Sequence, residues 1–241
     1  MAGTVPEAVR RYLSGLDCQL VGEAGLVSLL AAGSQVLRTR RGETVCAAGA
    51  ERRGCFMLVS GKVKLALLAQ DGAERVLDVV VPEATFGEAM LWSERRDNLC
   101  AEALSDSELL FMGKVAIGNA FDRNPAFARA LMRRVSAQSL RLLEDLEASC
   151  LLTAGERVER YLARNARRSQ RIGAHGEVQL PASKSIVASS LNLSAETFSR
   201  ELHRLASDAL ITIDRRTIHV HDIDALARSG ASVRRPIGRA A

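Results

Sequence analysis

The chain has 241 residues, of which 47% are hydrophobic and 25% are charged, and its formal net charge at pH 7 is +5. This length suits two modest domains better than one large one. No apolar run approaches the roughly 20 residues that span a bilayer, and the N-terminus lacks a charged region followed by an apolar core. We therefore expect a cytoplasmic protein with no membrane partner.

The positive charge is concentrated in the C-terminal part of the chain. Residues 151–241 hold 15 Lys and Arg against 9 Asp and Glu, whereas residues 1–150 hold 18 against 19. This distribution favours a phosphate-binding surface in the C-terminal part. The cysteines are odd in number and form no C-x-x-C pair, which predicts reduced and mostly buried thiols. They are Cys18, Cys46, Cys55, Cys100 and Cys150.

The N-terminal part begins with helical patterns and then changes to strands. Residues 5–32 carry two short helical patterns, the second over residues 23–32. From Gln35 onward, short β-prone runs alternate with turn signals such as Ser60-Gly61 and Asp71-Gly72, which predicts a barrel or sandwich of jelly-roll character. The predicted strands are 36–40, 44–47, 55–59, 62–68, 76–81, 99–103 and 108–112.

A long helix is predicted to start at Asn124-Pro125, where proline occupies the first turn. Its apolar residues recur at alternating spacings of three and four, which gives a heptad seam over about 24 residues. Leu140 and Leu143 lie off this seam, so that one face can meet the barrel while another meets a second copy of the chain. The residues expected at a homodimer interface are Leu131, Val135, Gln138, Leu142 and Leu146.

The C-terminal part opens with a capping box, Thr153-Ala154-Gly155-Glu156, which starts a new helix and places a domain boundary near residues 150–153. Farther along, Ser183 can cap a short helix that Asn192 can end in a left-handed conformation. Ser194 then begins a second helix. Two short helices joined by a tight turn predict a helix-turn-helix.

The second of these helices has two contrasting faces. Phe198, Leu202 and Leu205 form a stripe to be buried. On the other face, Glu196 can accept from a cytosine amino group and Arg200 can donate twice to a guanine edge. Residues 209–221 read as strand, turn and strand, which predicts a wing. The residues expected to face DNA are Ser194, Ala195, Glu196, Thr197, Ser199 and Arg200, with Lys184, Arg215 and Arg216.

Two segments resemble one family. Glu196-Thr197-Phe198-Ser199-Arg200 resembles the E-T-x-S-R core of the recognition helix in the CRP/FNR superfamily of bacterial transcription regulators. Ser199 favours the FNR and DNR branch, because the cyclic-AMP receptor branch normally has glycine there. Residues 56–64 resemble the strand, Ser-Gly turn and strand of the cyclic-nucleotide-binding fold. The resemblance extends over residues 20–228.

The resemblance implies an α+β architecture and a function. Residues 1–122 would form an effector-sensing β-roll (jelly roll), residues 123–150 a dimerisation helix and residues 151–229 a winged helix-turn-helix. The basic tail, residues 230–241, is expected to be disordered. The chain would act as a homodimer on double-stranded DNA that carries a TTGAT-type inverted repeat, with RNA polymerase as a partner and a small-molecule or gaseous effector.

The effector motif of the family is only half present. Residues 86–90 match the Gly-Glu helix start that binds ribose and phosphate, but the family's phosphate-binding arginine is missing ten residues later, where Asn98 stands. Arg95 and Arg96 come two or three positions early. A buried phosphodiester without its cation is costly, which disfavours cyclic nucleotides. The expected effector pocket comprises Phe86, Gly87, Glu88, Ala89, Met90, Asn98, Leu99 and Cys100.

Other signals remain open. An iron–sulfur cluster of the FNR type is disfavoured, because only Cys18 lies near the N-terminus. Glu88-Ala89-Met90, with Trp92 after it, resembles a segment of the DNR-type regulators, which bind haem and respond to nitric oxide. All four histidines lie in the C-terminal part, so a haem would need Met90, Cys100, another thiolate or a histidine from that part, such as His175, as its ligand. Thiol oxidation or another small molecule is an equal alternative.

Two other classes of function are disfavoured. The sequence has no H-E-x-x-H, P-loop or G-x-G-x-x-G motif, and its histidines, His175, His203, His219 and His221, cluster around the helix-turn-helix and wing. This pattern predicts that the chain is not an enzyme. A cyclic-nucleotide-type sensor that docks on another protein is disfavoured, because protein docking has no need for Glu196, Ser199 and Arg200 together.

Overall fold

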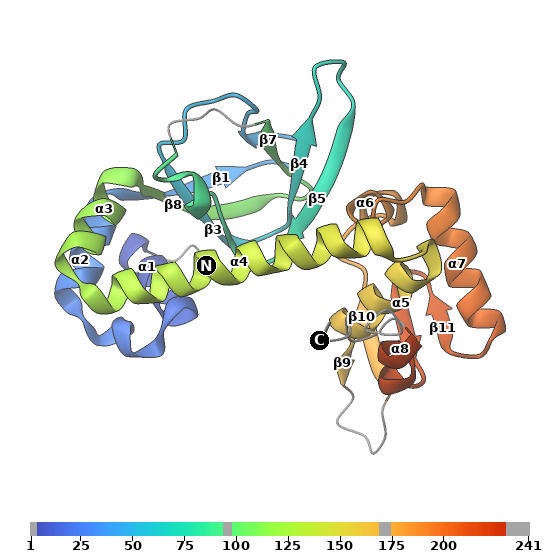
Figure 1. Ribbon diagram of the computed structural model, residues 1–241. Helices are drawn as coiled ribbons and strands as arrows, with labels where there is room; N and C mark the ends of the chain where they lie inside the picture. Colours follow the sequence, from blue (N-terminus) through green and yellow to red (C-terminus); the bar gives the residue numbers. More distant parts are fainter. Residues whose placement is uncertain (1–3, 94–97, 169–174, 230–241) are drawn as a thin grey trace, which may run out of the picture. The chain divides into compact units, whose positions relative to one another are not determined.

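The computed structural model describes residues 4–93, 98–168 and 175–229. The chain divides into two compact units, residues 1–141 and 142–241, and the long helix α4 (Pro125–Leu151) runs through the division (Figure 1). Arg95, Arg96 and the predicted tail 230–241 lie outside the described residues. None of the helices in the described part combines the length and the apolar character that a bilayer crossing demands.

The first unit contains two antiparallel four-stranded sheets, as the β-roll resemblance implies. One sheet has the order β1 (Ser34–Thr39), β8 (Ser107–Gly113), β3 (Gly54–Ser60) and β6 (Thr85–Phe86). The other has the order β2 (Thr44–Cys46), β7 (Leu99–Ala103), β4 (Val63–Leu68) and β5 (Glu74–Val80). Both sheets contribute to one core, which contains Phe56, Leu58, Val63, Val80, Phe86, Ala101 and Leu109.

The predicted Ser60-Gly61 turn joins β3 to β4 and requires glycine. Gly61 has a φ of +95°, in the left-handed region, and a Cβ at this position would lie 2.1 Å from the Ser107 hydroxyl oxygen. That hydroxyl accepts a hydrogen bond from the Lys62 backbone N–H at 3.2 Å. Any side chain would therefore strain the backbone and also disrupt the packing of this turn on β8.

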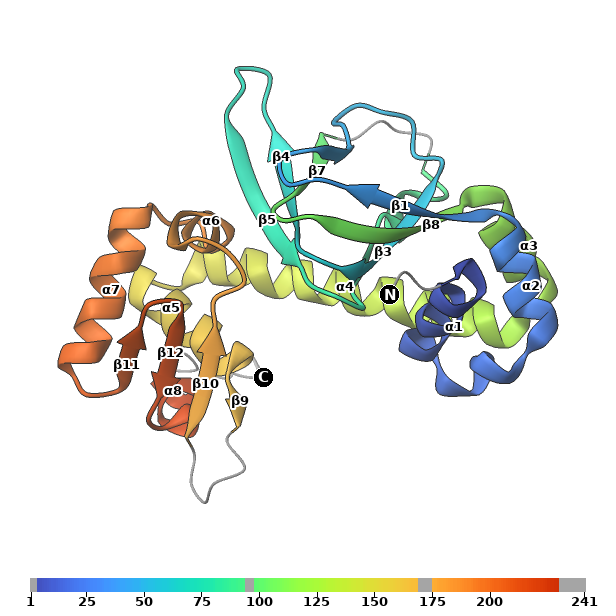
Figure 2. The same cartoon turned by 180° about the vertical axis from the view of Figure 1, so that it is seen from behind.

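Short helices complete the first unit (Figure 2). They are α1 (Val5–Leu16), η1 (Cys18–Gly22), α2 (Ala24–Ala32), η2 (Glu88–Met90) and α3 (Lys114–Arg123). Their apolar faces pack with β3, β8 and the first turns of α4 in a second core, which includes Tyr12, Leu30, Met112, Ile117 and Phe127. Helix α3 was not predicted, because its buried positions Ala116 and Ala120 are small and give only a weak apolar pattern.

The faces of α4 differ from the prediction by one residue. Leu131 is completely buried in the core of the first unit, and the Gln138 side chain hydrogen-bonds to that of Glu88. The prediction that Leu131 lies at the dimer interface is therefore wrong. Phe127 and Ala130 are buried as well. The first part of the predicted seam therefore packs against the rest of the first unit. An exposed seam with heptad spacing, which shares Leu146 with the predicted one, comprises Met132, Ser136, Ser139, Leu143, Leu146 and Cys150.

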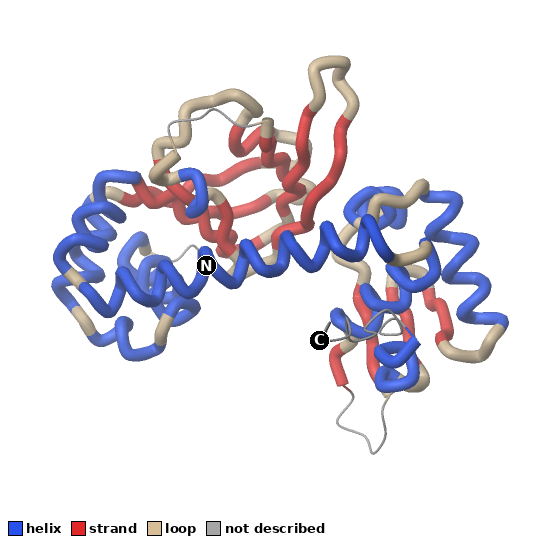
Figure 3. Tube along the Cα trace, in the orientation of Figure 1, coloured by secondary structure: helices blue, strands red, loops and turns tan. Residues whose placement is uncertain are grey.

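The second unit packs helices on a small antiparallel sheet (Figure 3). Its helices are α5 (Ala154–Asn165), α6 (Lys184–Ser190), α7 (Ala195–Ser207) and α8 (Ile223–Ser229). Its strands have the order β11 (Ile211–Asp214), β12 (Thr217–Val220), β10 (Gly176–Gln179) and β9 (Arg167–Arg168). The core includes Val158, Leu162, Val187, Phe198, Leu202, Leu205 and Ile218.

The division between the units falls inside α4, ahead of the expected boundary at residues 150–153. The last turns of α4 group with α5, because acidic residues of α4 pair with arginines of α5. Arg164 Nη1 lies 3.0 Å from Asp145 Oδ1, and Arg160 Nη2 lies 3.9 Å from Glu144 Oε2. The capping box at the start of α5 is present in full, with Thr153 and Glu156 each bonded to the other's backbone.

Candidate nucleic-acid interface and effector site

The two helices of the predicted helix-turn-helix begin and end where the sequence indicates. The Ser183 hydroxyl accepts from the Ile186 N–H at 3.4 Å, and the Ser194 hydroxyl accepts from the Thr197 N–H at 3.0 Å. Asn192, in the turn between them, has a φ of +57°. Serine caps and a left-handed asparagine are the local signals that separate α6 from α7.

Helix α7 buries one face and exposes the other. Phe198, Leu202 and Leu205 are completely buried. Glu196 and Arg200 are exposed and lie one turn apart on the same face. The Arg200 side chain is 65% exposed, and its Nε lies 3.8 Å from Glu201, an ion pair too open to hold it. Both side chains are thus available to base edges.

The other predicted residues of α7 surround this pair. Ser194 and Ala195 are exposed at the N-terminus of the helix, whereas Thr197 and Ser199 are half-buried. The Thr197 hydroxyl accepts a hydrogen bond from the Ser194 hydroxyl at 2.9 Å. Lys184, in the first turn of α6, is also half-buried. The structure therefore gathers the polar candidates at the start of α7.

The predicted wing is the hairpin of β11 and β12. Arg215 and Arg216 occupy its tip, both exposed, and Arg215 has a φ of +53°. The Arg216 carbonyl accepts from the Leu180 N–H at 2.9 Å, which fixes the tip without using the guanidinium. His221 holds the base of the hairpin, through hydrogen bonds to the Thr212 hydroxyl at 2.8 Å and the Ala209 carbonyl at 2.7 Å.

Arg216→Ala is expected to weaken binding to all DNA sequences alike. An exposed guanidinium at a hairpin tip suits a phosphate, and each phosphate that the protein no longer neutralises reduces the slope of log affinity against log salt by about 1 per protomer. Affinities for one operator and one random duplex, measured between 50 and 200 mM salt, would check this. A weakening confined to the operator would contradict the role assigned to Arg216.

An ion pair between a buried carboxylate and a partly exposed guanidinium connects α7 to α5. Glu159 of α5 is 5% exposed and accepts from Arg204 Nη2 at 2.7 Å, and Arg204 Nε also donates to Glu201 at 3.0 Å. Gly155 makes room for this pair, since a Cβ there would lie 3.0 Å from Arg204 Nη2. The guanidinium of Arg204 is thus engaged within the protein, whereas that of Arg200 is exposed.

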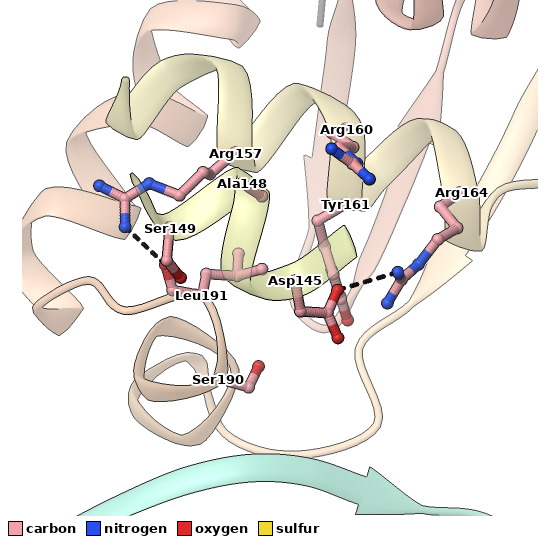
Figure 4. Close-up of a pocket in the computed structure, with 9 residues that line it drawn as sticks. All are labelled: Asp145, Ala148, Ser149, Arg157, Arg160, Tyr161, Arg164, Ser190 and Leu191. Carbon is pink, nitrogen blue, oxygen red and sulfur yellow. Dashed lines mark hydrogen bonds and ion pairs between the residues drawn. The ribbon is translucent and has the colours of Figure 1, made fainter. Parts of the chain in front are cut away.

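Helix α5 presents three arginines along one side of a pocket (Figure 4). Arg160 and Arg164 pair with the acidic residues of α4 described above. Arg157 instead donates to two carbonyl oxygens in the turn between α6 and α7. The pocket is lined by Asp145, Ala148, Ser149, Arg157, Arg160, Tyr161, Arg164, Ser190 and Leu191.

The residues of the predicted effector pocket come from two sheets, with Phe86 on β6 of one and Leu99 and Cys100 on β7 of the other. Phe86 ends β6 and stacks on Phe56, with ring centroids 5.0 Å apart, and Gly87 has a φ of +96°. Glu88 is completely buried, whereas Ala89 is exposed and Met90 half-buried. Asn98 is exposed ahead of β7, in which Leu99 and Cys100 are half-buried.

Glu88 is engaged by side chains of its own chain. The Thr85 hydroxyl and the Gln138 side chain hydrogen-bond to its carboxylate, and Arg134 Nε of α4 lies 3.5 Å from Oε1. Within the described residues, Oε2 of Glu88 and Nε of Arg134 make no hydrogen bond. The guanidinium therefore stabilises the Glu88 carboxylate by charge attraction and not by a directed hydrogen bond.

Burial dominates the acid–base properties of this cluster. It raises the pKa of Glu88 above its usual range, while Thr85 and Arg134 oppose the shift. Burial also raises the pKa of Tyr12 and of the Cys55 thiol well above their ordinary values, and the neighbouring Glu88 adds to both shifts. Cys55 is thus held as an unreactive thiol. The prediction of mostly buried thiols is wrong, because Cys46 and Cys100 are half-buried and Cys18 and Cys150 are exposed.

Comparison with known proteins agrees with both parts of this description. Residues 36–124 match the family described as a cyclic nucleotide-binding domain, and residues 156–229 match the Crp-like helix-turn-helix domain. The nitrogen fixation regulation protein FixK of Azorhizobium caulinodans is 31% identical over 177 residues, which cover 72% of this chain and 70% of that protein. The chain belongs to the CRP/FNR family of transcription regulators.

This CRP/FNR regulator is also similar to other transcription regulators and to solved structures of the same fold. A CRP-like cAMP-activated global transcriptional regulator of Mycobacterium tuberculosis is 26% identical over 190 residues, covering 78% of this chain and 84% of that protein. The structure of FixK2 from Bradyrhizobium japonicum has the same fold, with a TM-score of 0.71 and 23% identity, over 81% of this chain and 96% of that one. Such regulators are not enzymes.

Sequence reasoning missed several residues that organise this CRP/FNR regulator. Arg134 and Gln138 share the buried face of α4 with Leu131, at spacings of three and four. Polar side chains at core positions of a helix require buried partners, a signal that could have indicated an acceptor such as Glu88. Arg157 and Arg204 gave no comparable signal, because arginines on helices are usually solvated.

Proposed function

We propose that this chain is a homodimeric, sequence-specific transcription regulator that acts in the bacterial cytoplasm and binds a TTGAT-type inverted repeat. The observation that carries the proposal is the pair Glu196 and Arg200, exposed at the start of a helix whose opposite face is completely buried. Carboxylate and guanidinium groups in this position suit cytosine and guanine edges in the major groove. RNA polymerase is the partner that such a regulator would recruit or block.

A gel-shift titration tests this proposal. The wild-type chain should retard a duplex with a TTGAT-type inverted repeat at concentrations at which a scrambled duplex of equal length stays free. Specific binding is typically about 10³-fold tighter than non-specific binding or better. Equal retardation of both duplexes contradicts sequence-specific recognition. No retardation of either duplex under any effector would favour the alternative of a sensor that docks on a protein.

The dimer would form along the exposed seam of α4. Met132, Leu143 and Leu146 are each more than half exposed in the single chain, and they recur at heptad positions. Two such seams related by a two-fold axis would bury these side chains and present two α7 helices to half-sites of an inverted repeat.

Leu143→Glu is expected to dissociate the dimer, and Leu142→Glu is the matched control. The two leucines are 60% and 61% exposed, but only Leu143 lies on the seam. Facing carboxylates at a two-fold interface cost about 3 kcal/mol or more, which raises the dissociation constant about 100-fold or more. Sedimentation equilibrium gives the comparison. A larger effect of Leu142→Glu would favour the seam predicted from the sequence.

The signal belongs to the proposal as well, with two candidates. In the first, haem in the β-roll binds nitric oxide, with sulfur from Met90 or Cys100 as an axial ligand. Both side chains are half-buried, and the first unit has no histidine. In the second, a thiol is oxidised or a small molecule binds. Cys18 and Cys150 are exposed and are therefore better candidates for oxidation than the buried Cys55.

An absorption spectrum separates these candidates. Protein purified with haem supplied should show a Soret band that shifts when nitric oxide is added, if haem carries the signal. Met90→Ala and Cys100→Ser would then change that band if either residue is the ligand. A spectrum without a Soret band would contradict the haem hypothesis and leave thiol oxidation or another small molecule as the signal. Cyclic nucleotides fit poorly, because Glu88 is already engaged by Arg134 and Asn98 supplies no cation.

A further inference from the structure

We infer that Arg157 is a positioning residue for DNA recognition: it holds the turn between α6 and α7, and so determines where α7 presents Glu196 and Arg200. The inference rests on the proposed DNA-binding function and adds to it a residue that lies outside both helices of the motif.

The guanidinium of Arg157 bridges α5 and the turn. Nη1 donates to the Leu191 carbonyl oxygen at 3.0 Å and to the Asn192 carbonyl oxygen at 3.1 Å. Nε lies 3.5 Å from the carbonyl oxygen of Thr153, in the side chain's own helix cap. Figure 4 shows this side chain directed to Leu191, whereas Arg164 of the same helix is directed to Asp145.

The turn needs this interaction because its own backbone satisfies only the earlier carbonyls of α6. The N–H groups of Leu191 and Leu193 donate to the Ala188 carbonyl at 3.0 and 2.9 Å, and that of Asn192 donates to Ser189 at 3.0 Å. The carbonyls of Leu191 and Asn192 come after these and accept from Arg157. A cation at the C-terminal end of a helix is also favoured by the helix dipole.

The geometry of the turn controls the recognition residues at short range. Asn192 is left-handed, a conformation that asparagine tolerates but does not strongly prefer, so that a bond to its carbonyl fixes the direction of the chain. Only Leu193 separates Asn192 from Ser194, which caps α7. Glu196 and Arg200 follow within the first two turns, and base recognition tolerates displacements of only about 0.5 Å.

Arg157 is predicted to differ from a residue that touches DNA. Its charged head is committed to protein carbonyls and is only half exposed, so it should neutralise no phosphate. Its removal should therefore reduce the preference for the operator over random DNA, without changing the dependence of binding on salt.

The experiment compares Arg157→Gln with Arg160→Gln in the full chain. Both changes remove one positive charge from α5, but Arg160 pairs with Glu144 at 3.9 Å instead of holding the turn. The operator is the duplex that the wild-type chain itself enriches from a random pool. A wild type that enriches none would contradict the proposed function, and this inference with it, before any variant is made.

For Arg157→Gln, we expect the ratio of operator to random affinity to fall by about tenfold or more, part of the discrimination that base contacts provide. Affinity for random DNA, the salt slope and the thermal midpoint should stay close to those of Arg160→Gln. An unchanged ratio, an equal fall in Arg160→Gln, or a salt slope reduced by about 1 per protomer would overturn the inference.

Arg157→Lys keeps the test decisive if Arg157→Gln does not fold. Lysine retains the charge but presents a single ammonium, which cannot reproduce the spread of the guanidinium over two carbonyls and the helix cap. A folded Arg157→Lys with a reduced operator preference supports the positioning role, whereas the wild-type preference overturns it.

Discussion

Arg200→Ala is expected to abolish the preference of the protein for its operator. Arg200 is exposed on the face of α7 opposite Phe198, Leu202 and Leu205, so its removal should leave the packing of the helix intact. A bidentate contact from arginine to guanine provides about 1–3 kcal/mol of discrimination, and a dimer on an inverted repeat makes two such contacts, about 2–6 kcal/mol together. Titrations of operator and random duplexes would measure the decrease.

The control for this prediction is Arg216→Ala at the tip of the wing, which also removes one exposed arginine from each protomer. Arg200→Ala should reduce operator affinity far more than random affinity, while Arg216→Ala should reduce both equally. If Arg200→Ala reduces operator and random binding to the same extent, the role assigned to Arg200 is wrong, and if Arg216→Ala reduces operator binding alone, the role assigned to Arg216 is wrong.

Arg134→Met is expected to destabilise the first unit by about 3 kcal/mol, the low end for a broken buried ion pair, because Thr85 and Gln138 still hydrogen-bond to Glu88. The Glu88 carboxylate would be left buried without a cation. For a unit of this size, the thermal midpoint should fall by roughly 6–12 °C. Calorimetry on the full chain, with a separate transition for each unit, would measure the change.

The loss of stability in Arg134→Met, which is the deficit relative to wild type in the free energy of unfolding, should depend on pH. Burial already raises the pKa of Glu88, and its ionisation opposes folding, so the contribution of this group is present at low pH and is lost as pH rises through its folded pKa. Without Arg134 that pKa rises further, and the deficit should be larger at pH 8 than at pH 5. Glu88→Gln combined with Arg134→Met removes the titrating carboxylate, and its deficit should not change with pH.

Local signals explain why most of the second unit could be predicted. Ser183, Asn192 and Ser194 mark helix boundaries by hydrogen bonds to their immediate neighbours, and the spacing of Phe198 and Leu202 defines a buried face. These features depend on residues within one or two turns. The hairpin around Arg215 and Arg216 is local in the same sense.

The misplaced features all depend on contacts distant in the sequence. Periodicity identified α4 as a two-faced helix, but whether residue 131 or 132 meets the β-roll depends on packing against α1 and β3, which the helix sequence does not contain. The pair of Glu88 with Arg134 joins residues 46 positions apart. Resemblance to the family marked Glu88 as a ligand-binding residue, but it gave no indication of the arginine beside it.

The ion pair of Glu88 with Arg134 of α4 limits which substitutions in this sequence could create a site for a cyclic nucleotide. A cyclic-nucleotide site built on the family's pattern would need a guanidinium near Asn98 and also a Glu88 that is released from Arg134. The first change alone leaves Glu88 engaged by Arg134, and the second alone leaves the Glu88 carboxylate buried without a cation. We therefore expect that variants of this sequence selected for DNA binding controlled by a cyclic nucleotide will carry at least two substitutions, and that no single substitution will suffice.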